Sequence, residues 1–228
     1  MQLNAKHYNA LVSSLHGESG WSGQNPRQWA SFIIGEDHDL ISWLPNNSQS
    51  RQQLHDYCAD ACNSVEACFL AVMAWGGMRR DHGRNAWQAL NSTHKQLWKT
   101  LAVMRTEKSL SREEVYDILN KANIKGLGPA YFTKLMFFFS PLKNCYILDQ
   151  WTARSASLLL DKDNFPIRMH LGKTVMRNNP ATIYEIFCQL IENLAQDSSF
   201  KSLRPDQIEE CLFGGRNSEW RHYVKQNG

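Results

Sequence analysis

The sequence has no apolar run approaching the roughly 20 residues that cross a bilayer. Its first seven residues, Met1 to His7, form no apolar signal region. These absences predict a protein without a membrane span that works in the cytoplasm. Internal repeats and low-complexity tracts are absent as well. A chain of 228 residues then suits one large domain or two lobes that share a cleft.

Cysteine is scarce, because six in 228 residues are too few for a secreted disulfide scaffold. His55, Cys58 and Cys62 fall at i, i+3 and i+7, so they could share one helix face and bind a metal. No fourth ligand lies at a suitable spacing, and we favour buried thiols on an apolar face. The sequence therefore predicts no metal site.

Strand-like alternation is also scarce, and helical periodicity dominates. Residues 65–75 are apolar all round, which predicts a buried central helix. Ser111-Arg112-Glu113-Glu114 is a capping box that starts another helix. Further helices are predicted to begin at Pro26, near Asp149 and at Pro180. The predicted fold class is all-α.

The chain lacks a large excess of charge of either sign, since its net charge is only +3, but the charged residues are unevenly distributed. Residues 76–108 carry net +5 and residues 121–154 net +4, which leaves −6 for the remainder. A basic middle between acidic ends is expected of a protein that binds a polyanion on one side. A chance distribution of surface charge explains the same pattern equally well.

A glycine-rich loop, Gly76-Gly77-Met78-Arg79-Arg80, follows the apolar helix. It pairs a large apolar side chain with two arginines on a freely turning backbone. Such a loop could push Met78 into a DNA duplex while Arg79 and Arg80 hold phosphates. A helix end followed by a solvated charged loop accounts for the same residues.

The most informative stretch is Ile124-Lys125-Gly126-Leu127-Gly128-Pro129-Ala130, between two predicted helices. Glycines on either side of an apolar residue let the backbone turn sharply and leave N–H groups at the start of the second helix. Those N–H groups and the helix dipole can bind an anion. Pro129 fits the first turn of that helix. The expected anion is a DNA phosphate.

This stretch, with Ile147-Leu148-Asp149 placed so that Asp149 lies 19 residues after Ala130, resembles the helix-hairpin-helix DNA glycosylase superfamily. There the turn is typically Leu-Pro-Gly-Val-Gly, followed by an aspartate at about that distance. Residues 128–135 look closest to a bacterial family similar to 8-oxoguanine DNA glycosylases. The motif match covers roughly residues 110–160.

The resemblance implies that a damaged or modified base is flipped into a pocket and its N-glycosidic bond cleaved. Asp149 would be the catalytic carboxylate, although a helix-capping aspartate accounts for it too. The family's nucleophilic lysine position holds Ala130 here, so water-driven, monofunctional excision ranks first. Lys134, one turn further on, leaves a bifunctional glycosylase/lyase as an alternative. A non-catalytic DNA-binding module is the other alternative.

The resemblance also implies a two-lobed bundle with a central cleft for DNA and the flipped base. We predict one lobe from residues 1–75 and 150–228. The other would be residues 76–149, ending in the helix-hairpin-helix at about 111–139. The DNA contacts expected are Lys125, Gly126, Leu127, Gly128, Ala130, Met78, Arg79 and Arg80. Candidate base-pocket residues are Trp75, Tyr131 and Trp151.

No cofactor is expected to be required, because only Cys188 and Cys211 follow Cys145, too few for the iron–sulfur cluster of some relatives. Relatives often hold a monovalent cation at the hairpin, here through carbonyls near Ile124 and Leu127. The partner is double-stranded DNA, and we expect a monomer associated with the nucleoid. Oxidised guanine, an alkylated base, or a modified phage base excised in antiviral defence are all compatible substrates.

Overall fold

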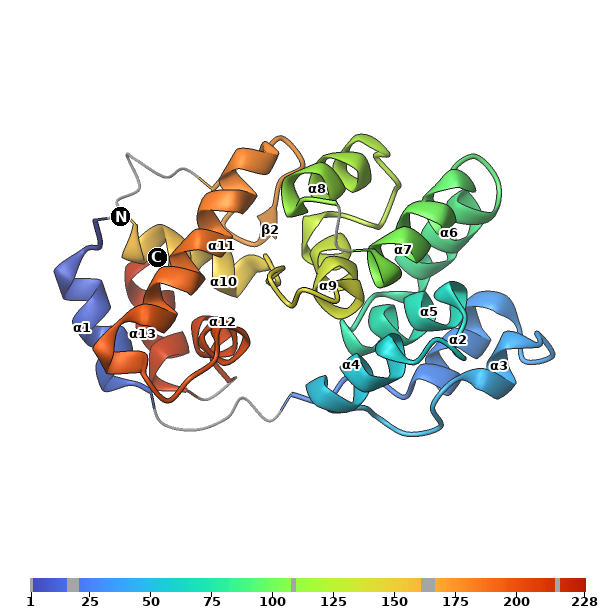
Figure 1. Ribbon diagram of the computed structural model, residues 1–228, viewed down its shortest axis with the longest axis horizontal. Coiled ribbons are helices and arrows are strands. Elements are labelled where there is room, and N and C mark those ends of the chain that lie inside the picture. Colours follow the sequence, from blue (N-terminus) through green and yellow to red (C-terminus); the bar gives the residue numbers. More distant parts are fainter. Residues whose placement is uncertain (1, 16–20, 108–109, 161–166, 216–217) are drawn as a thin grey trace. The chain divides into compact units, whose positions relative to one another are not determined.

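A computed structural model describes residues 2–15, 21–107, 110–160, 167–215 and 218–228 (Figure 1). The described part is mostly helical, with one two-stranded sheet, so the all-α prediction is confirmed. The elements are α1 (Ala5–Ser13), α2 (Pro26–Ile34), α3 (Leu40–Trp43), α4 (Arg51–Ala59), α5 (Val65–Trp75), α6 (Arg80–Asn91), α7 (Gln96–Thr106), α8 (Arg112–Lys121), α9 (Pro129–Phe139), α10 (Gln150–Leu159), β1 (Met169–His170), β2 (Thr174–Val175), α11 (Ala181–Gln196), the 3₁₀ helix η1 (Ser198–Phe200), α12 (Pro205–Phe213) and α13 (Glu219–Asn227).

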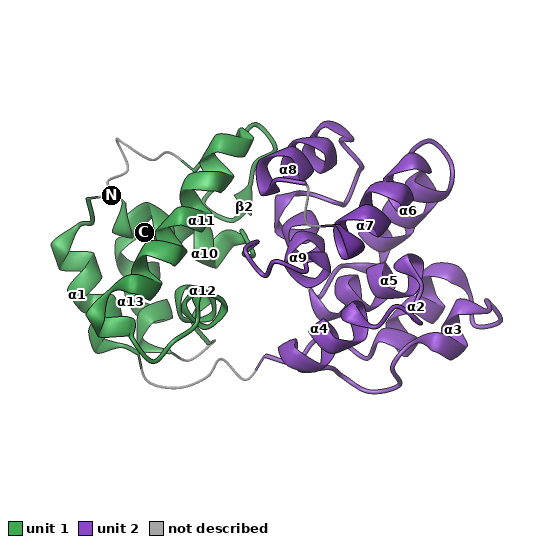
Figure 2. Ribbon diagram, in the orientation of Figure 1, with its two compact units in different colours: residues 1–20, 146–228 green, residues 21–145 purple. Residues whose placement is uncertain are grey.

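The chain divides into two compact units (Figure 2). Unit 1 comprises residues 1–20 and 146–228, and unit 2 comprises residues 21–145. The predicted boundary at residue 75 is therefore wrong for the first half of the chain. Helix α5, buried from Ala67 to Trp75, packs on α2, α4, α7 and α9, so residues 21–75 belong with the helical hairpin. The second boundary lies at 145/146, four residues before the predicted one.

Unit 2 is built around α5. The Gln24 N–H donates to the Ala74 carbonyl at 3.2 Å, which ties the start of the unit to the end of this helix. Trp29 on α2 is 1% exposed, and its indole N–H donates to the Met78 carbonyl at 2.8 Å. Helix α9 also packs on α5, so the element that follows the hairpin turn is held by the centre of the core.

Unit 1 joins the two ends of the chain. The Asn4 N–H donates to the Leu159 carbonyl at 2.8 Å, which fixes α1 to the end of α10. Inside the unit, the buried Ser155 hydroxyl donates to the Leu212 carbonyl at 2.7 Å and lies 3.0 Å from the Trp220 indole nitrogen. These bonds connect α10, α12 and α13, so α10 is firmly positioned.

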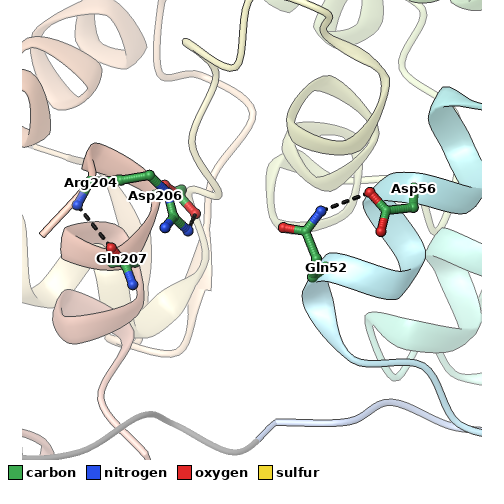
Figure 3. A network of polar contacts seen from close by, with 5 residues as sticks. All are labelled: Gln52, Asp56, Arg204, Asp206 and Gln207. Atoms are coloured by element: carbon green, nitrogen blue, oxygen red, sulfur yellow. Dashed lines mark hydrogen bonds and ion pairs between the residues drawn. The ribbon is translucent and has the colours of Figure 1, made fainter.

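Exposed polar side chains reinforce helices in each unit (Figure 3). On α4, the Gln52 amide donates to Asp56 at 2.7 Å. At the start of α12, the Arg204 guanidinium donates to Asp206 at 3.0 Å. Such exposed local pairs add little stability. Within the described part of the chain, none of the helices is long and apolar enough to cross a membrane.

Candidate active site

The helical hairpin joins α8 to α9 through residues 122–128. The Ser111 and Glu114 capping box is present, with the Glu114 carboxylate 2.8 Å from the Ser111 nitrogen. Gly126 has φ +89°, and a Cβ there would lie 2.8 Å from the His82 Cα and carbonyl oxygen. The turn therefore requires glycine at 126 for both its conformation and its space. Leu127 is 2% exposed and anchors the turn in unit 2.

Gly128 differs from Gly126. Its φ is −78°, and a Cβ there would meet no heavy atom within 4 Å. It caps α9 without a side-chain hydrogen bond, and Pro129 occupies the first turn as predicted. The backbone N–H groups of Gly128 and Ala130 donate to no acceptor among the described residues. Two such N–H groups, open space at Gly128 and the exposed Lys125 nearby in sequence together suit an anion.

Lys134 is buried, at 7% exposure. Its ammonium donates to the Ala130 carbonyl at 2.7 Å and lies 5.7 Å from the centroid of the Tyr131 ring. A Cβ on Gly76 would lie 2.8 Å from the Lys134 Cδ, so that glycine leaves room for the lysine stem. Because helical side chains lean towards the N-terminus, the amine is brought back one turn to Ala130.

Asp149 is half-buried and caps α10, as the sequence predicts. Its Oδ1 accepts hydrogen bonds from the N–H groups of Trp151 at 2.8 Å and Thr152 at 3.2 Å. Thr152 in turn accepts from the Asp149 N–H at 2.9 Å and donates to the Ile147 carbonyl at 2.8 Å. Oδ2 accepts no hydrogen bond from any described residue. One oxygen is thus fixed and the other is available for chemistry.

The candidate base-pocket aromatics are not all alike. Trp75 is 5% exposed, meets Phe138 edge-on with ring centroids 4.9 Å apart, and its buried indole N–H finds no acceptor among the described residues. Trp75 and the half-buried Tyr131 belong to unit 2. Trp151 belongs to unit 1, where the Arg221 guanidinium lies 4.3 Å from its ring centroid. A cation therefore lies over the Trp151 ring, and its role in a base pocket stays a prediction.

The loop at residues 76–80 does not expose the apolar side chain that the sequence predicted to enter DNA. Met78 is fully buried, at 0% exposure, and its backbone carbonyl accepts the Trp29 indole hydrogen bond, so it is a core residue and not an intercalating side chain. Arg79 is exposed and forms an ion pair with Asp81 at 3.0 Å. The Arg80 guanidinium stacks 3.4 Å from the centroid of the Phe32 ring. Helix α6 starts at Arg80, so the arginines lie at a helix N-terminus.

His55, Cys58 and Cys62, which have metal-like spacing in the sequence, do not share one helix, because α4 ends at Ala59. Burial raises the pKa of the Cys58 thiol, whereas Cys62 is exposed and lies beyond the end of the helix. No group of three metal-binding side chains occurs within the described ranges. Buried packing, the interpretation favoured from sequence, describes Cys58.

The sequence analysis predicted an all-α fold and so missed a β-hairpin in unit 1. Residues 161–166 lie outside the described part of the chain. Strands β1 and β2 pair antiparallel, with Met169 opposite Val175. The Leu171-Gly172 pair between short β-branched or apolar segments was the available signal. Strands of two residues are too short for alternation to show.

One comparison with known protein families identifies the chain. Residues 19–213 match the family described as "Putative 8-oxoguanine DNA glycosylase OGG-like protein". No curated protein and no solved structure matches the chain. The match spans most of the 228 residues, including the hairpin, Lys134 and Asp149. The chain therefore belongs to the OGG-like family of DNA glycosylases.

Proposed function

We propose that the protein excises a damaged or modified base from double-stranded DNA, with Asp149 as the catalytic carboxylate. The observation that carries this assignment is that the two Asp149 carboxylate oxygens differ in their hydrogen bonding. Oδ1 is held by two backbone N–H groups, whereas Oδ2 has no partner among the described residues. The carboxylate lies at the N-terminus of α10, the positive end of the helix dipole.

The proposed reaction is hydrolysis of the bond between C1′ and the base. The base leaves with the electron pair of that bond and a proton, and positive charge develops on the sugar. Asp149 stabilises that charge, as carboxylates do in glycoside hydrolysis. Water then supplies hydroxide to C1′, its other proton returns to solvent, and an abasic site remains. Flipping the nucleotide out costs a few kcal/mol and selects for weakly paired bases.

The grip on DNA is assigned to the helical hairpin. The N–H groups of Gly128 and Ala130 would bind a phosphate, with Lys125 adding charge, irrespective of sequence. Gly128 supports this role because nothing inside the protein requires glycine there, whereas close approach of a phosphate does.

A second candidate reaction uses Lys134. Its amine would displace the base at C1′, and the base would leave with a proton. The C1′–O4′ bond would then break, with O4′ taking a proton, to give an imine between Lys134 and C1′. Loss of a proton from C2′ would allow elimination of the 3′ phosphate. The observation in favour is the 2.7 Å hydrogen bond that holds the amine at Ala130, the position of the family's lysine. Water-driven excision remains the first choice, because the amine must leave that carbonyl in order to react.

The test of Asp149 separates catalysis from capping. Asparagine caps helices about as well as aspartate, so Asp149→Asn should fold normally and bind DNA. We expect base release to fall by roughly 100-fold or more when the charge is removed. The matched control is Asp197→Asn, another capping aspartate of unit 1, whose Oδ1 accepts from the Ser199 N–H at 2.8 Å. Equal activity of Asp149→Asn and wild type would reject the catalytic assignment.

The substrate is identified by a base-release screen. Genomic DNA, oxidised or alkylated DNA, and heavily modified phage DNA are incubated with protein, and released bases are identified by mass spectrometry. Release of an oxidised or alkylated base would support repair, and release of a phage-specific base would support antiviral defence. If no abasic sites form in any of these, the glycosylase assignment fails.

Borohydride reduction tests Lys134, because it converts an imine between protein and DNA into a stable bond. Under the water-driven mechanism we expect no covalent adduct. An adduct that disappears in Lys134→Ala, but persists in the exposed control Lys125→Ala, would favour the lysine mechanism instead.

A further inference from the structure

The tip of the β-hairpin in unit 1 carries an unusual residue. The turn is closed by the Lys173 N–H, which donates to the His170 carbonyl at 3.0 Å. Its two central residues, Leu171 and Gly172, have φ of +48° and +64°. Positive φ at both positions is the pattern of a type I′ turn, where Asn-Gly is favoured.

Neither the backbone nor the core accounts for leucine at this position. A bulky side chain with positive φ is strained, because its Cβ crowds the following carbonyl. Burial does not offset that strain, since Leu171 is 79% exposed, the largest value among the exposed large hydrophobic side chains of the described residues. An outlier that folding leaves unexplained points to function.

The stem below this tip is tied together by hydrogen bonds from a buried side chain. Asn179 is 1% exposed, and its amide group donates to the carbonyls of Arg168 at 2.9 Å and Met176 at 2.7 Å. Its oxygen accepts from the Arg168 N–H at 2.8 Å. Val175 on β2 is 2% exposed, and β2 packs on α10. A tip supported by such a stem can keep its conformation when it contacts a partner.

The tip is also linked to the candidate catalytic carboxylate inside the same unit. With its amide oriented to satisfy both neighbours, Gln150 donates to the Lys173 carbonyl at 2.8 Å and accepts from the Trp151 indole N–H at 2.8 Å. The Trp151 backbone N–H donates to Asp149 at 2.8 Å. One short chain of hydrogen bonds therefore fixes the hairpin relative to Asp149.

The charged side chains of residues 167–179, which contain the hairpin, are of one sign. Residues 167–179 contain Arg168, His170, Lys173 and Arg177 and no aspartate or glutamate. Arg168, His170 and Lys173 are exposed. An apolar point flanked by cations complements a nucleic-acid duplex, in which phosphates surround a stack of apolar base faces.

We propose that Leu171 is a wedge that enters the base stack of duplex DNA beside the nucleotide to be excised, while Arg168 and Lys173 contact phosphates. Inserted apolar side chains unstack base steps in this way. The proposal deepens the function proposed above and rests on it for the purpose of the wedge. It gives to Leu171 the role that the sequence predicted for the buried Met78.

The test measures unstacking without catalysis. Asp149→Asn protein is titrated into a duplex that carries 2-aminopurine beside a tetrahydrofuran abasic-site analogue, and the fluorescence rise at saturation reports unstacking. Adding Leu171→Asn should cut that rise by about fivefold or more, while affinity changes by less than about threefold, since phosphate contacts dominate affinity. Lys173→Ala should have the reverse effect: it should weaken duplex binding but leave the fluorescence rise at saturation unchanged.

Folding does not confound this test. Asparagine accepts positive φ better than leucine, so Leu171→Asn should melt at the same temperature as its parent or higher. The matched control is Leu142→Asn, the same change at another exposed leucine, which is 43% exposed and belongs to unit 2. It should leave the fluorescence rise unchanged.

Three results would overturn the wedge. They are an undiminished rise in Leu171→Asn, an equal loss in Leu142→Asn, and self-association that Leu171→Asn abolishes while unstacking persists. A Leu171-dependent rise in a protein that releases no base from any DNA would support the wedge and reject the glycosylase assignment. Base release from single strands, with no Leu171-dependent fluorescence rise in duplexes, would support the glycosylase assignment and reject the wedge.

Discussion

Leu127 and Leu171 are the same residue at comparable places in two turns. Each is next to a glycine with positive φ, Gly126 at +89° and Gly172 at +64°. Leu127, in the helical hairpin of unit 2, is 2% exposed, whereas Leu171, in the β-hairpin of unit 1, is 79% exposed. The first side chain anchors its turn, and the second projects from it.

The difference shows what each turn offers to a partner. With Leu127 buried, the helical hairpin presents its backbone, namely the N–H groups of Gly128 and Ala130. With Leu171 exposed, the β-hairpin presents a side chain on a stem held by Asn179. A turn that offers backbone suits phosphates, and one that offers an apolar side chain suits bases.

The largest expected difference between the turns is in core packing. Leu127→Ala should lower the free energy of unfolding by about 2–5 kcal/mol, because it leaves a cavity in unit 2. Leu171→Ala should change it by no more than about 0.5 kcal/mol, as for other surface substitutions. Urea denaturation of the two variants measures both values. Similar losses would show that the two leucines are not buried to different degrees in solution.

The glycines should differ next. Gly126→Ala should cost about 2–3 kcal/mol, because positive φ is strained and the new Cβ meets the His82 backbone at 2.8 Å. Gly172→Ala should cost only about 1 kcal/mol, since nothing lies within 4 Å of its Cβ. Thermal denaturation checks the order, and a cost as large at Gly172 would contradict the role of His82.

Gly128→Ala separates folding from binding within the helical hairpin. Its φ of −78° and open surroundings should hold the change in unfolding free energy below about 1 kcal/mol. The methyl group would stand where a phosphate approaches, so duplex affinity should weaken about tenfold, or about 1.4 kcal/mol. Fluorescence anisotropy with labelled duplex measures it. Unchanged affinity would reject the proposal that this turn binds a DNA phosphate.

The smallest expected effect is a difference in acid response. Hydrogen bonds from Ser111 lower the pKa of Glu114 below its ordinary 4.5. The cap therefore contributes fully above that pH, and its contribution is lost as pH falls through the lower, folded-state pKa. Amide exchange in α8 should accelerate between about pH 5 and 3 beyond its intrinsic pH dependence, relative to the β-hairpin, whose stem is held by the Asn179 amide.

The control for this effect is Glu114→Gln, which keeps a capping box but does not titrate. It should show less acid acceleration in α8 than wild type. An equal response in both proteins would assign the effect to other carboxylates of the helix.

Local interactions explain what could be predicted from the sequence. The start of α2 at Pro26, the Ser111 cap of α8 and the Asp149 cap of α10 were all predictable, because each depends on residues within a few positions. The need for a turn at Gly126 and Gly128 was equally clear. The catalytic role of Asp149 stays a prediction, since a cap and a catalyst have the same local sequence.

Contacts between distant segments explain what could not be predicted. The sequence predicted Met78 as an exposed wedge, but the folded chain buries it, and its carbonyl accepts a hydrogen bond from Trp29, 49 residues earlier. The boundary at residue 75 failed because α5 packs on helices from both sides of it in sequence. The β-hairpin was missed because its strands are two residues long and its stem is held by Asn179.

The sequence by itself determined the helical fold class, the ends of the helices around the hairpin and the family resemblance of residues 124–149, because these follow from neighbouring residues. Only the tertiary structure decided which apolar side chain is exposed. Burial depends on what distant segments cover, and they covered Leu127 and Met78 but left Leu171 uncovered.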